Sequence, residues 1–444
     1  MLDVRLIREK TEWVKAGLKR RHGGDEAAVD RVVVLDGERR GILVEVEELK
    51  NRRNTSSKEI GGLMKAGKKE EAELLKEEVR QSNTRIGELE ADVTRLEGEI
   101  RDLMLRMPNI PHESVPEGKT EEDNPEVRRH GQPREFGFKP RNHIEICENL
   151  GLIDFKRAAK LSGSGFLLYT GMGARLERAL INFLLDLHQR EHGYSEVSPP
   201  FLVNRDCMIG VGQFPKFEDQ VYITQEGTDE STLGSLCLVP TAEAPVANFH
   251  REELMNHADL PRKYCAYTPC FRAEAGAAGL GTRGMIRVHQ FDKVELINVV
   301  HPDDGYAMLE DMVGCAEKVL QLMGLHYRTI VLCTGDMGFG SAKTYDIEVW
   351  APGQGQYLEV SSCSNCEDFQ ARRMNLRFKD TEGKNRFPHI LNGSGTALAR
   401  LYVAILETHQ HEDGSVVIPE ALRPYMGTDR ITQDAIFGKC PGKS

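Results

Sequence analysis

The sequence lacks any long apolar run. Its longest uninterrupted apolar segments fall far short of the about 20 residues that a helix needs to cross a bilayer. Residues 1–10 carry several charges and no apolar stretch of the kind that marks a secretory signal peptide. We therefore expect a cytoplasmic protein that does not associate with membranes.

The cysteines lack the spacing of a disulfide framework. The ten cysteines are scattered along the chain, which favours free thiols in a reducing compartment. Cys363 and Cys366 alone suggest a zinc site, but the sequence offers neither a second Cys-x-x-Cys pair nor a neighbouring pair of histidines to complete four ligands. Zinc therefore remains a minor alternative.

An excess of basic residues is also missing. The chain has 58 Lys and Arg against 69 Asp and Glu, a formal net charge of -11. A protein that binds nucleic acid over its whole surface would not carry this charge, so any such contact must be local. The sequence contains neither a Walker lysine loop nor a strand–glycine–helix dinucleotide fingerprint.

The most regular pattern present is a coiled-coil seam in the N-terminal quarter. Apolar positions between 75 and 107 alternate in steps of four and three, which predicts a supercoiled helix. A looser helical pattern precedes them, and residues 65–69 form a predicted tip, so residues 26–107 should make an antiparallel hairpin about 50 Å long. The seam consists of Leu75, Val79, Ser82, Ile86, Leu89, Val93, Leu96, Ile100, Leu103 and Met107.

The chain length favours two domains. We predict a helical arm over 1–111, a polar and proline-containing linker over 112–142, and a second domain over 143–444. Short strand-like runs predominate between 235 and 375, without a regular alternation of strands and helices. This predicts an α+β fold, a mostly antiparallel sheet with flanking helices. The helices are expected at 172–192, 303–323 and 395–409.

The basic residues of the arm are concentrated near its tip. Between Lys50 and Lys69 there are seven basic residues and one acidic residue. A solvated helix face is the ordinary meaning of such a run. In an acidic protein it is also where an RNA backbone would be held.

Residues 271–295 read as two strands joined by a loop of small residues. Arg272 and Glu274 lie two residues apart and share a face of the first strand, and Arg287, Phe291 and Glu295 follow on the return. One face of this hairpin would hold a polyanion, an aromatic base and an ammonium group. A surface ion pair and a core phenylalanine are the simpler alternatives.

Three further segments combine polar groups with regular structure. Residues 241–243, Thr-Ala-Glu, are typical of a helix N-terminus. Within 359–362, Glu359 and Ser361 would share a strand face, and the hydroxyls favour a hard cation such as Mg²⁺. Residues 391–400 predict a glycine-serine turn opening a helix, with Arg400 about one and a half turns inside, which suits an anion.

Together, in this order, these segments resemble the seryl-tRNA synthetases of class II. Residues 193–200, ending in Pro200, are similar to motif 1 of the class. Residues 271–295 are similar to motif 2 and residues 393–400 to motif 3. The segments 241–243 and 359–362 and the N-terminal arm resemble features of the seryl branch itself.

The resemblance implies a role for each matching residue. Arg272 would hold the α-phosphate of ATP, Arg287 the γ-phosphate and Glu274 the adenine edge, while Phe291 and Arg400 would cover the adenine. Arg272, Glu359 and Arg400 would be catalytic, and Glu359 and Ser362 would bind Mg²⁺. The implied ATP contacts are Arg272, Ala273, Glu274, Arg287, Val288, Phe291, Glu359, Val360, Ser361, Ser362 and Arg400. The implied L-serine contacts are Thr241, Ala242, Glu243, Glu295, Asn392 and Ser394.

The resemblance also implies the reaction and the partners. The enzyme would activate L-serine with ATP and transfer it to tRNA(Ser), and to tRNA(Sec) where one exists. The basic arm would bind the tRNA, and the motif 1 region would form a homodimer. Two alternatives remain open, namely a paralogue that activates an amino acid for a carrier or a secondary metabolite, and a non-catalytic coiled-coil interaction protein.

Overall fold

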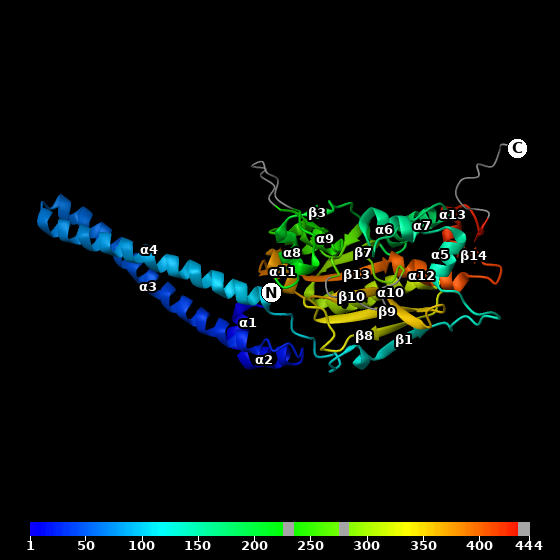
Figure 1. Cartoon of the computed structure of the whole chain (residues 1–444). Coiled ribbons are helices and arrows are strands. Elements are labelled where there is room, and N and C mark those ends of the chain that lie inside the picture. Colours follow the sequence, from blue (N-terminus) through cyan, green and yellow to red (C-terminus); the bar gives the residue numbers. More distant parts are fainter. Residues whose placement is uncertain (225–234, 275–283, 434–444) are drawn as a thin grey trace. The chain divides into compact units, whose positions relative to one another are not determined.

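The computed structural model describes residues 1–224, 235–274 and 284–433 (Figure 1). The chain divides into two compact units. The first comprises residues 1–19 and 23–108, and the second comprises residues 20–22 and 109–444. Within the described part of the chain, no helix combines the length and the apolar composition needed to cross a membrane.

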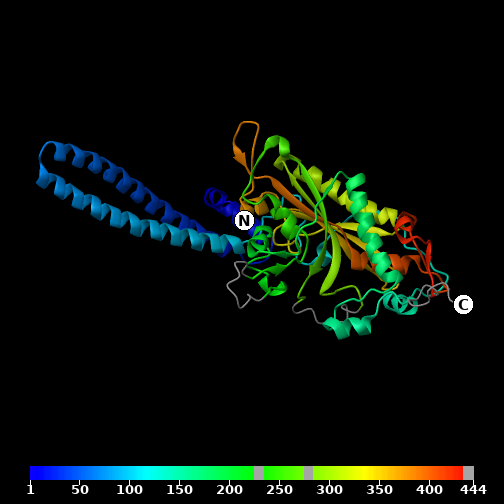
Figure 2. The ribbon, with the colours of Figure 1, turned by 90° about the horizontal axis from the view of Figure 1, so that it is seen from above.

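The first unit is a long helical hairpin. Helices α1 (Val4–Glu9) and α2 (Thr11–Lys19) precede α3 (Glu26–Lys65) and α4 (Lys69–Arg106), and Figure 2 shows α3 and α4 running side by side. The predicted coiled coil is confirmed, because every seam position from 75 to 107 is buried or half-buried and the turn falls within the predicted tip. Ile86 and Leu89 of α4 pack against Val46 of α3.

The second unit is built on an eight-stranded sheet. All neighbouring strands are antiparallel except the edge pair β2–β6, so the predicted fold class is confirmed. The strand order is β1 (Glu126–His130), β8 (Tyr327–Val331), β9 (Lys343–Ala351), β10 (Gln356–Asn365), β13 (His389–Ala397), β7 (Gln290–Val300), β6 (Arg262–Phe271) and β2 (Ser195–Glu196). Strand β1 lies inside the segment 112–142 that the sequence predicts as a linker, because residues 126–130 pair with β8.

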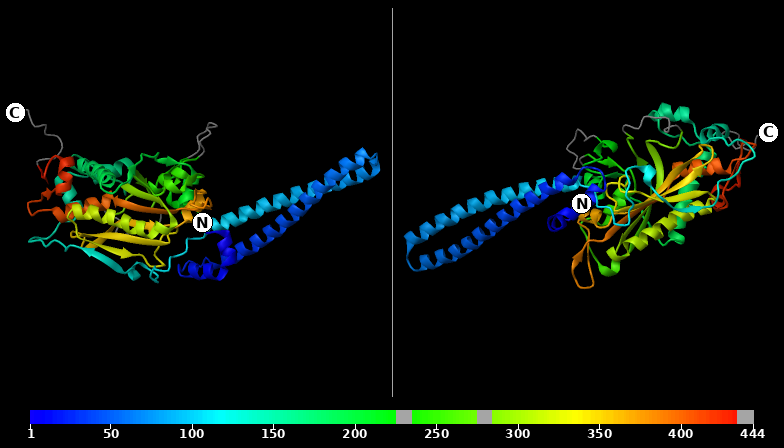
Figure 3. Two further views of the ribbon diagram at one scale, coloured as in Figure 1. Left: turned by 180° about the vertical axis from the view of Figure 1, so that it is seen from behind. Right: turned by 90° about the horizontal axis from the view of Figure 1, so that it is seen from below.

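Two hydrophobic cores cover the two faces of the sheet. Leu296 of β7 belongs to the core beneath α7 (Met172–Arg190), α10 (Gly305–Leu322) and α12 (Leu398–His409), and Figure 3 shows α10 crossing this face. Ile297 belongs to the core beneath α8 (Arg205–Val211), α9 (Glu243–Ala247) and α11 (Phe369–Met374). Because side chains alternate along a strand, Phe291, Lys293 and Glu295 face the same side as Ile297.

Helix α12 begins later than the sequence predicts. Residues 393–397 continue strand β13 instead of opening the helix, and a bulge at Gly395 shifts the register against β7. A side chain at Gly395 would place a Cβ 2.7 Å from His188 Nε2, so only glycine fits this close approach. Arg400 consequently lies in the first turn of α12, not one and a half turns inside it.

Candidate active site

Two adjoining cavities open on the face of the sheet that carries α8, α9 and α11. The larger has a volume of about 440 Å³ and the smaller about 210 Å³. Arg272, Glu274 and Arg287 line both. The hairpin that the sequence predicts therefore forms the wall between two connected chambers.

The hairpin positions its charged residues through continuous strand pairing. Strands β6 and β7 pair without interruption from Arg262 opposite Val299 to Phe271 opposite Gln290. Beyond the last pair, the Arg272 guanidinium carbon lies 5.1 Å from the centroid of the Phe291 ring, and Arg272 Nε donates to the Pro240 carbonyl. Arg287 forms an ion pair with Glu274. The small-residue loop that the sequence predicts here falls largely on residues 275–283, outside the described residues.

Arg400 closes one side of the smaller cavity. Its Nε donates to the Ile286 carbonyl at 3.1 Å, and its Nη1 donates to the Glu359 carbonyl at 2.8 Å. The cavity is also lined by Phe291, Val288 and Ser394. An aromatic ring and a guanidinium held in one narrow chamber suit a flat, electron-rich ring between them.

A buried acid dominates the larger cavity. Glu243 Oε1 accepts from Gln370 Nε2 at 2.6 Å and from Asn392 Nδ2 at 3.1 Å. Burial, with a further contribution from the Glu295 carboxylate, raises the pKa of Glu243 to about 7. Thr241 Oγ1 accepts from the Glu243 backbone N–H at 3.2 Å, next to Ala242, which is the N-cap residue of α9. Residues 241–243 therefore do open a helix, and their role in binding serine stays a prediction.

A buried ion pair lies beneath the cavities. Lys293 and Glu295, 6% and 3% exposed, form an ion pair, and Thr241 Oγ1 donates to Glu295 Oε2 at 2.9 Å. Lys293 lines the smaller cavity, but the sequence reasoning missed it. Lys293 could have been predicted from the sequence, because it lies between Phe291 and Glu295 on the same face of the strand. Gln370 was also missed, because no motif marks α11.

A second bulge rearranges the predicted metal pair. Strand β10 pairs Glu359 with Glu348, Ser361 with Ile347 and Ser362 with Asp346, so Val360 is the extra residue. The expectation that Glu359 and Ser361 share a face is therefore wrong. Ser361 is buried and donates to the Ser394 carbonyl at 2.6 Å. The bulge places Glu359 and Ser362 on one face instead, opposite two acids of β9.

The oxygen atoms around Ser362 fit a hard cation. Asp346 Oδ1 is buried without a hydrogen-bond partner, and burial together with the Glu359 carboxylate raises the pKa of Asp346 well above its usual range. Among the described residues, no three His, Cys, Asp or Glu side chains converge to hold a metal by themselves. Carboxylate and hydroxyl oxygens are ligands that Mg²⁺ takes together with phosphates and water. Cys363 and Cys366 are buried thiols.

Six residues that the resemblance implies as contacts do not line either cavity. Glu295 lies behind Thr241 and Lys293, and Ser361 points away as described. The Ala273 backbone N–H donates to the Gln220 carbonyl. The six are Ala242, Ala273, Glu295, Val360, Ser361 and Ser362, and all other implied contacts line one or both cavities.

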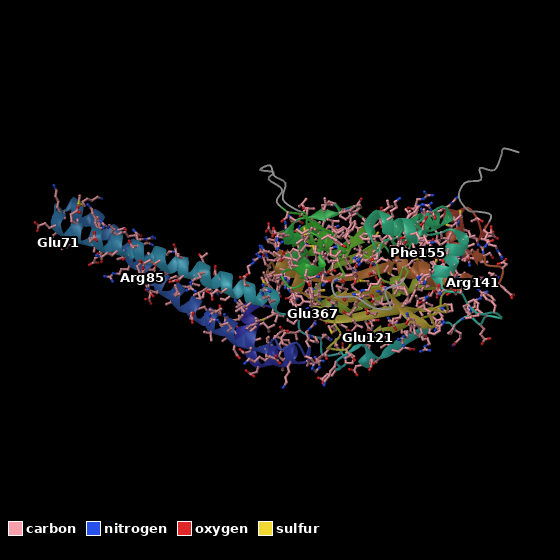
Figure 4. All side chains as sticks on the ribbon, viewed as in Figure 1. Glu71, Arg85, Glu121, Arg141, Phe155 and Glu367 are labelled. Atoms are coloured by element: carbon pink, nitrogen blue, oxygen red, sulfur yellow. The ribbon has the colours of Figure 1, made fainter. Side chains whose placement is uncertain are left out.

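The basic run of the arm is partly neutralised by the facing helix. Lys50 pairs with Glu90 at 2.7 Å, and Arg52 pairs with Glu78 at 3.4 Å. Side chains project from the arm along its whole length, with Glu71 near the tip (Figure 4). Lys65, Lys68 and Lys69 are exposed, and Lys68 lies 3.0 Å from Glu71. The tip lysines are therefore among the accessible positive charges of the arm.

Comparison with known protein families matches both units of the chain. Residues 1–111 match the seryl-tRNA synthetase N-terminal domain. Residues 222–409 match the tRNA synthetase class II core domain of the G, H, P, S and T type. A serine–tRNA ligase from Syntrophomonas wolfei is 54% identical over 96% of this chain and 98% of its own length.

Solved structures agree with these matches over nearly the whole chain. The seryl-tRNA synthetase from Pyrococcus horikoshii, complexed with ATP, superimposes with a TM-score of 0.89 and 42% identity, covering 97% of this chain and 99% of its own. The serine–tRNA ligase from Naegleria fowleri, in complex with AMP, gives a TM-score of 0.85 and 31% identity, covering 97% and 98%.

Proposed function

The chain belongs to the seryl-tRNA synthetase family of class II, and we propose that its two connected cavities carry out both steps of serine transfer. In this proposal ATP occupies the smaller cavity and L-serine the larger one, with the α-phosphate at Arg272 between them. The observation that carries the proposal is that Arg272, Glu274 and Arg287 line both chambers. Two substrates that react with each other must be bound close together, as in two sites that share a boundary.

The chemistry requires no nucleophile from the protein. The serine carboxylate attacks the α-phosphorus, forms a new oxygen–phosphorus bond and releases pyrophosphate. A terminal ribose hydroxyl of the tRNA then attacks the seryl carbonyl and releases AMP. Arg272 contributes by stabilising the charge that develops on phosphorus. Mg²⁺ held by Glu359 and Ser362 would neutralise phosphate charge when bound.

Serine selection follows from the polar groups of the larger cavity. The Glu243 carboxylate suits the substrate ammonium group, while Thr241 and Asn392 of the same cavity and Ser394 of the adjoining one offer partners to the hydroxyl. A site that satisfies a hydroxyl disfavours alanine, because alanine leaves those buried polar groups unpaired. Threonine is disfavoured by the size of its extra methyl group.

Serine recognition should depend on pH through Glu243. A group with a raised pKa stays protonated below that value, and a neutral acid cannot pair with an ammonium ion. We expect kcat/KM for serine in pyrophosphate exchange to fall about tenfold for each pH unit below about 7. Glu243→Gln should lower the plateau and remove this limb. An acid limb of the same position in Glu243→Gln would assign it to another group.

We propose that the tip of the arm binds tRNA(Ser), and tRNA(Sec) where one exists. Replacing Lys65, Lys68 and Lys69 with glutamine should raise the KM for tRNA at least tenfold and leave serine-dependent exchange within twofold. The salt dependence of tRNA binding, as log K against log[salt], should become shallower by roughly 2, since three phosphate contacts are lost.

The acidic residues at the same tip of the arm provide a matched control. Glu70, Glu71 and Glu73 occupy the first turns of α4, and their replacement by glutamine should leave charging unchanged or improve it. An equal loss of charging and exchange in the lysine variant would mean that these lysines support the fold and do not contact RNA.

We propose that a second copy of the chain covers the motif 1 region. A groove of about 390 Å³ there is lined by apolar groups, among them Pro199, Pro200 and Leu202. Phe249 beside it is 59% exposed and Leu202 is 43% exposed. Exposed apolar side chains clustered around one groove are typical of an interface.

A further inference from the structure

We propose that His143 and Glu407 are positioning residues for ATP, acting through the backbone of residues 285–287 and not by contact with the substrate. Neither side chain is among the described residues that line the two cavities of the site. Both are buried, with 1% and 0% exposure. The inference rests on the proposed function, because it assumes that Arg287 and the smaller cavity serve ATP.

Glu407 connects α12 with the start of α5 (His143–Leu150) and with the turn that precedes β10. It lies in the last turns of α12, the helix whose first turn carries Arg400. Its Oε1 accepts from the His143 backbone N–H at 2.8 Å, at the start of α5, and from Gln354 Nε2 at 3.0 Å. Its Oε2 accepts from the Gly353 and Gln354 backbone N–H groups at 2.8 and 3.2 Å. Gly353 and Gln354 form the turn that leads into β10 and Glu359.

His143 extends this junction to motif 2. Its Nδ1 lies 3.1 Å from Glu407 Oε1, and its Nε2 lies 3.2 Å from the Met285 backbone nitrogen. A carboxylate only accepts and a backbone N–H only donates. The ring is therefore neutral, with its hydrogen on Nδ1 and an acceptor at Nε2. Gln354 Nε2 also lies 3.2 Å from Nδ1, but its shorter hydrogen bond goes to Glu407 Oε1, so it does not compete for the hydrogen on Nδ1.

The neighbouring glycine leaves room for this contact. Gly284 has φ +75°, and a Cβ there would lie 2.2 Å from His143 Nε2. Any side chain at this position would displace the imidazole from the Met285 N–H, apart from the strain of the left-handed conformation. The local backbone thus accommodates the histidine.

The result is a clamp on two consecutive residues. His143 holds the Met285 N–H, and Arg400 Nε holds the Ile286 carbonyl at 3.1 Å. Both hydrogen bonds depend on residues of α12. Arg400 makes one of them directly, and Glu407 supports the other by holding His143. The next residue, Arg287, reaches both cavities. Because the backbone at 285–286 is held in place, the position from which the Arg287 side chain extends toward the cavities is also fixed.

Two substitutions of His143 separate the clamp from simple support of the fold. His143→Gln can place an acceptor near the position of Nε2 and keep the bond to the Met285 N–H. His143→Asn can place a donor near the position of Nδ1 and keep the bond to Glu407, but it does not reach Met285. Both remove the ring, so their effects on folding should be similar.

We expect His143→Asn to raise the KM for ATP about tenfold, with the KM for serine within twofold and a small change in kcat. His143→Gln should restore the KM for ATP to within threefold of the wild type. Gly284→Ala, which alters neither buried side chain, should reproduce the asparagine result. His409→Asn is the control, since His409 lies on α12 but bonds to the Met323 carbonyl. It should change neither KM.

Hydrogen exchange at the Met285 amide tests the clamp independently of catalysis. Protection should fall in His143→Asn and persist in His143→Gln. Equal protection and equal KM values in the two variants would overturn the proposal and leave His143 a structural residue. A wild-type enzyme without serine-dependent exchange would refute the proposed function, whereas the amide result would still decide the clamp.

Discussion

Replacing Arg272 with alanine should lower kcat/KM for serine-dependent pyrophosphate exchange by about a thousandfold. Removing one preoriented donor from a transition state that develops charge costs about 10²–10³ in rate. Arg272 combines a donor with a full positive charge, and its orientation is set by the Pro240 carbonyl and the Phe291 ring. The loss should appear mainly in kcat, because the charge develops only during the reaction.

The fold should tolerate this change. Arg272 is exposed, so the midpoint of urea unfolding should move little. Arg272→Lys keeps the charge but loses the planar fork, and it should recover only a small part of the activity. Full activity in Arg272→Lys would show that a diffuse charge is sufficient. A near-normal rate in Arg272→Ala would remove Arg272 from the reaction.

Replacing Lys293 with methionine should destabilise the protein by about 3–5 kcal/mol. Breaking a buried ion pair leaves the remaining charge without its partner in a poorly solvated place. In this variant the Glu295 carboxylate, 3% exposed, would keep only the Thr241 hydroxyl among these partners. Urea unfolding at pH 8 should report the full loss.

A double replacement distinguishes the effect of the unpaired charge on stability from the effect of the changed side-chain volume. Lys293→Met combined with Glu295→Gln removes both charges and should recover most of the lost stability. Serine-dependent exchange should remain impaired, because the smaller cavity has lost the Lys293 ammonium group. Additive destabilisation in the double variant would mean that Lys293 and Glu295 are not coupled.

The elements that the sequence predicts well have a local physical cause. The coiled coil follows from a repeat at positions 75–107, and the helix at 305–322 follows from its apolar stripe. The motif 2 hairpin follows from two runs of alternating residues around a loop of small ones. Each depends on neighbours along the chain, so a single sequence contains the information.

The features that the sequence does not reveal depend on contacts between distant segments. The bulges at Val360 and Gly395 arise from the register of β10 and β13 with their partners. Because of the first bulge, Ser362 and not Ser361 shares a strand face with Glu359. Because of the second, Arg400 lies in the first turn of α12. Gln370 meets Glu243 from 127 residues away. No pattern of neighbouring residues in the sequence predicts such a contact.

The most direct test of the account is pyrophosphate–ATP exchange measured with each of the twenty amino acids. We predict exchange that depends on serine, with alanine and threonine at least a hundredfold less efficient. No exchange with serine would contradict the proposed reaction. Preferential exchange with glycine or alanine would instead identify a paralogue that supplies an amino acid to another acceptor.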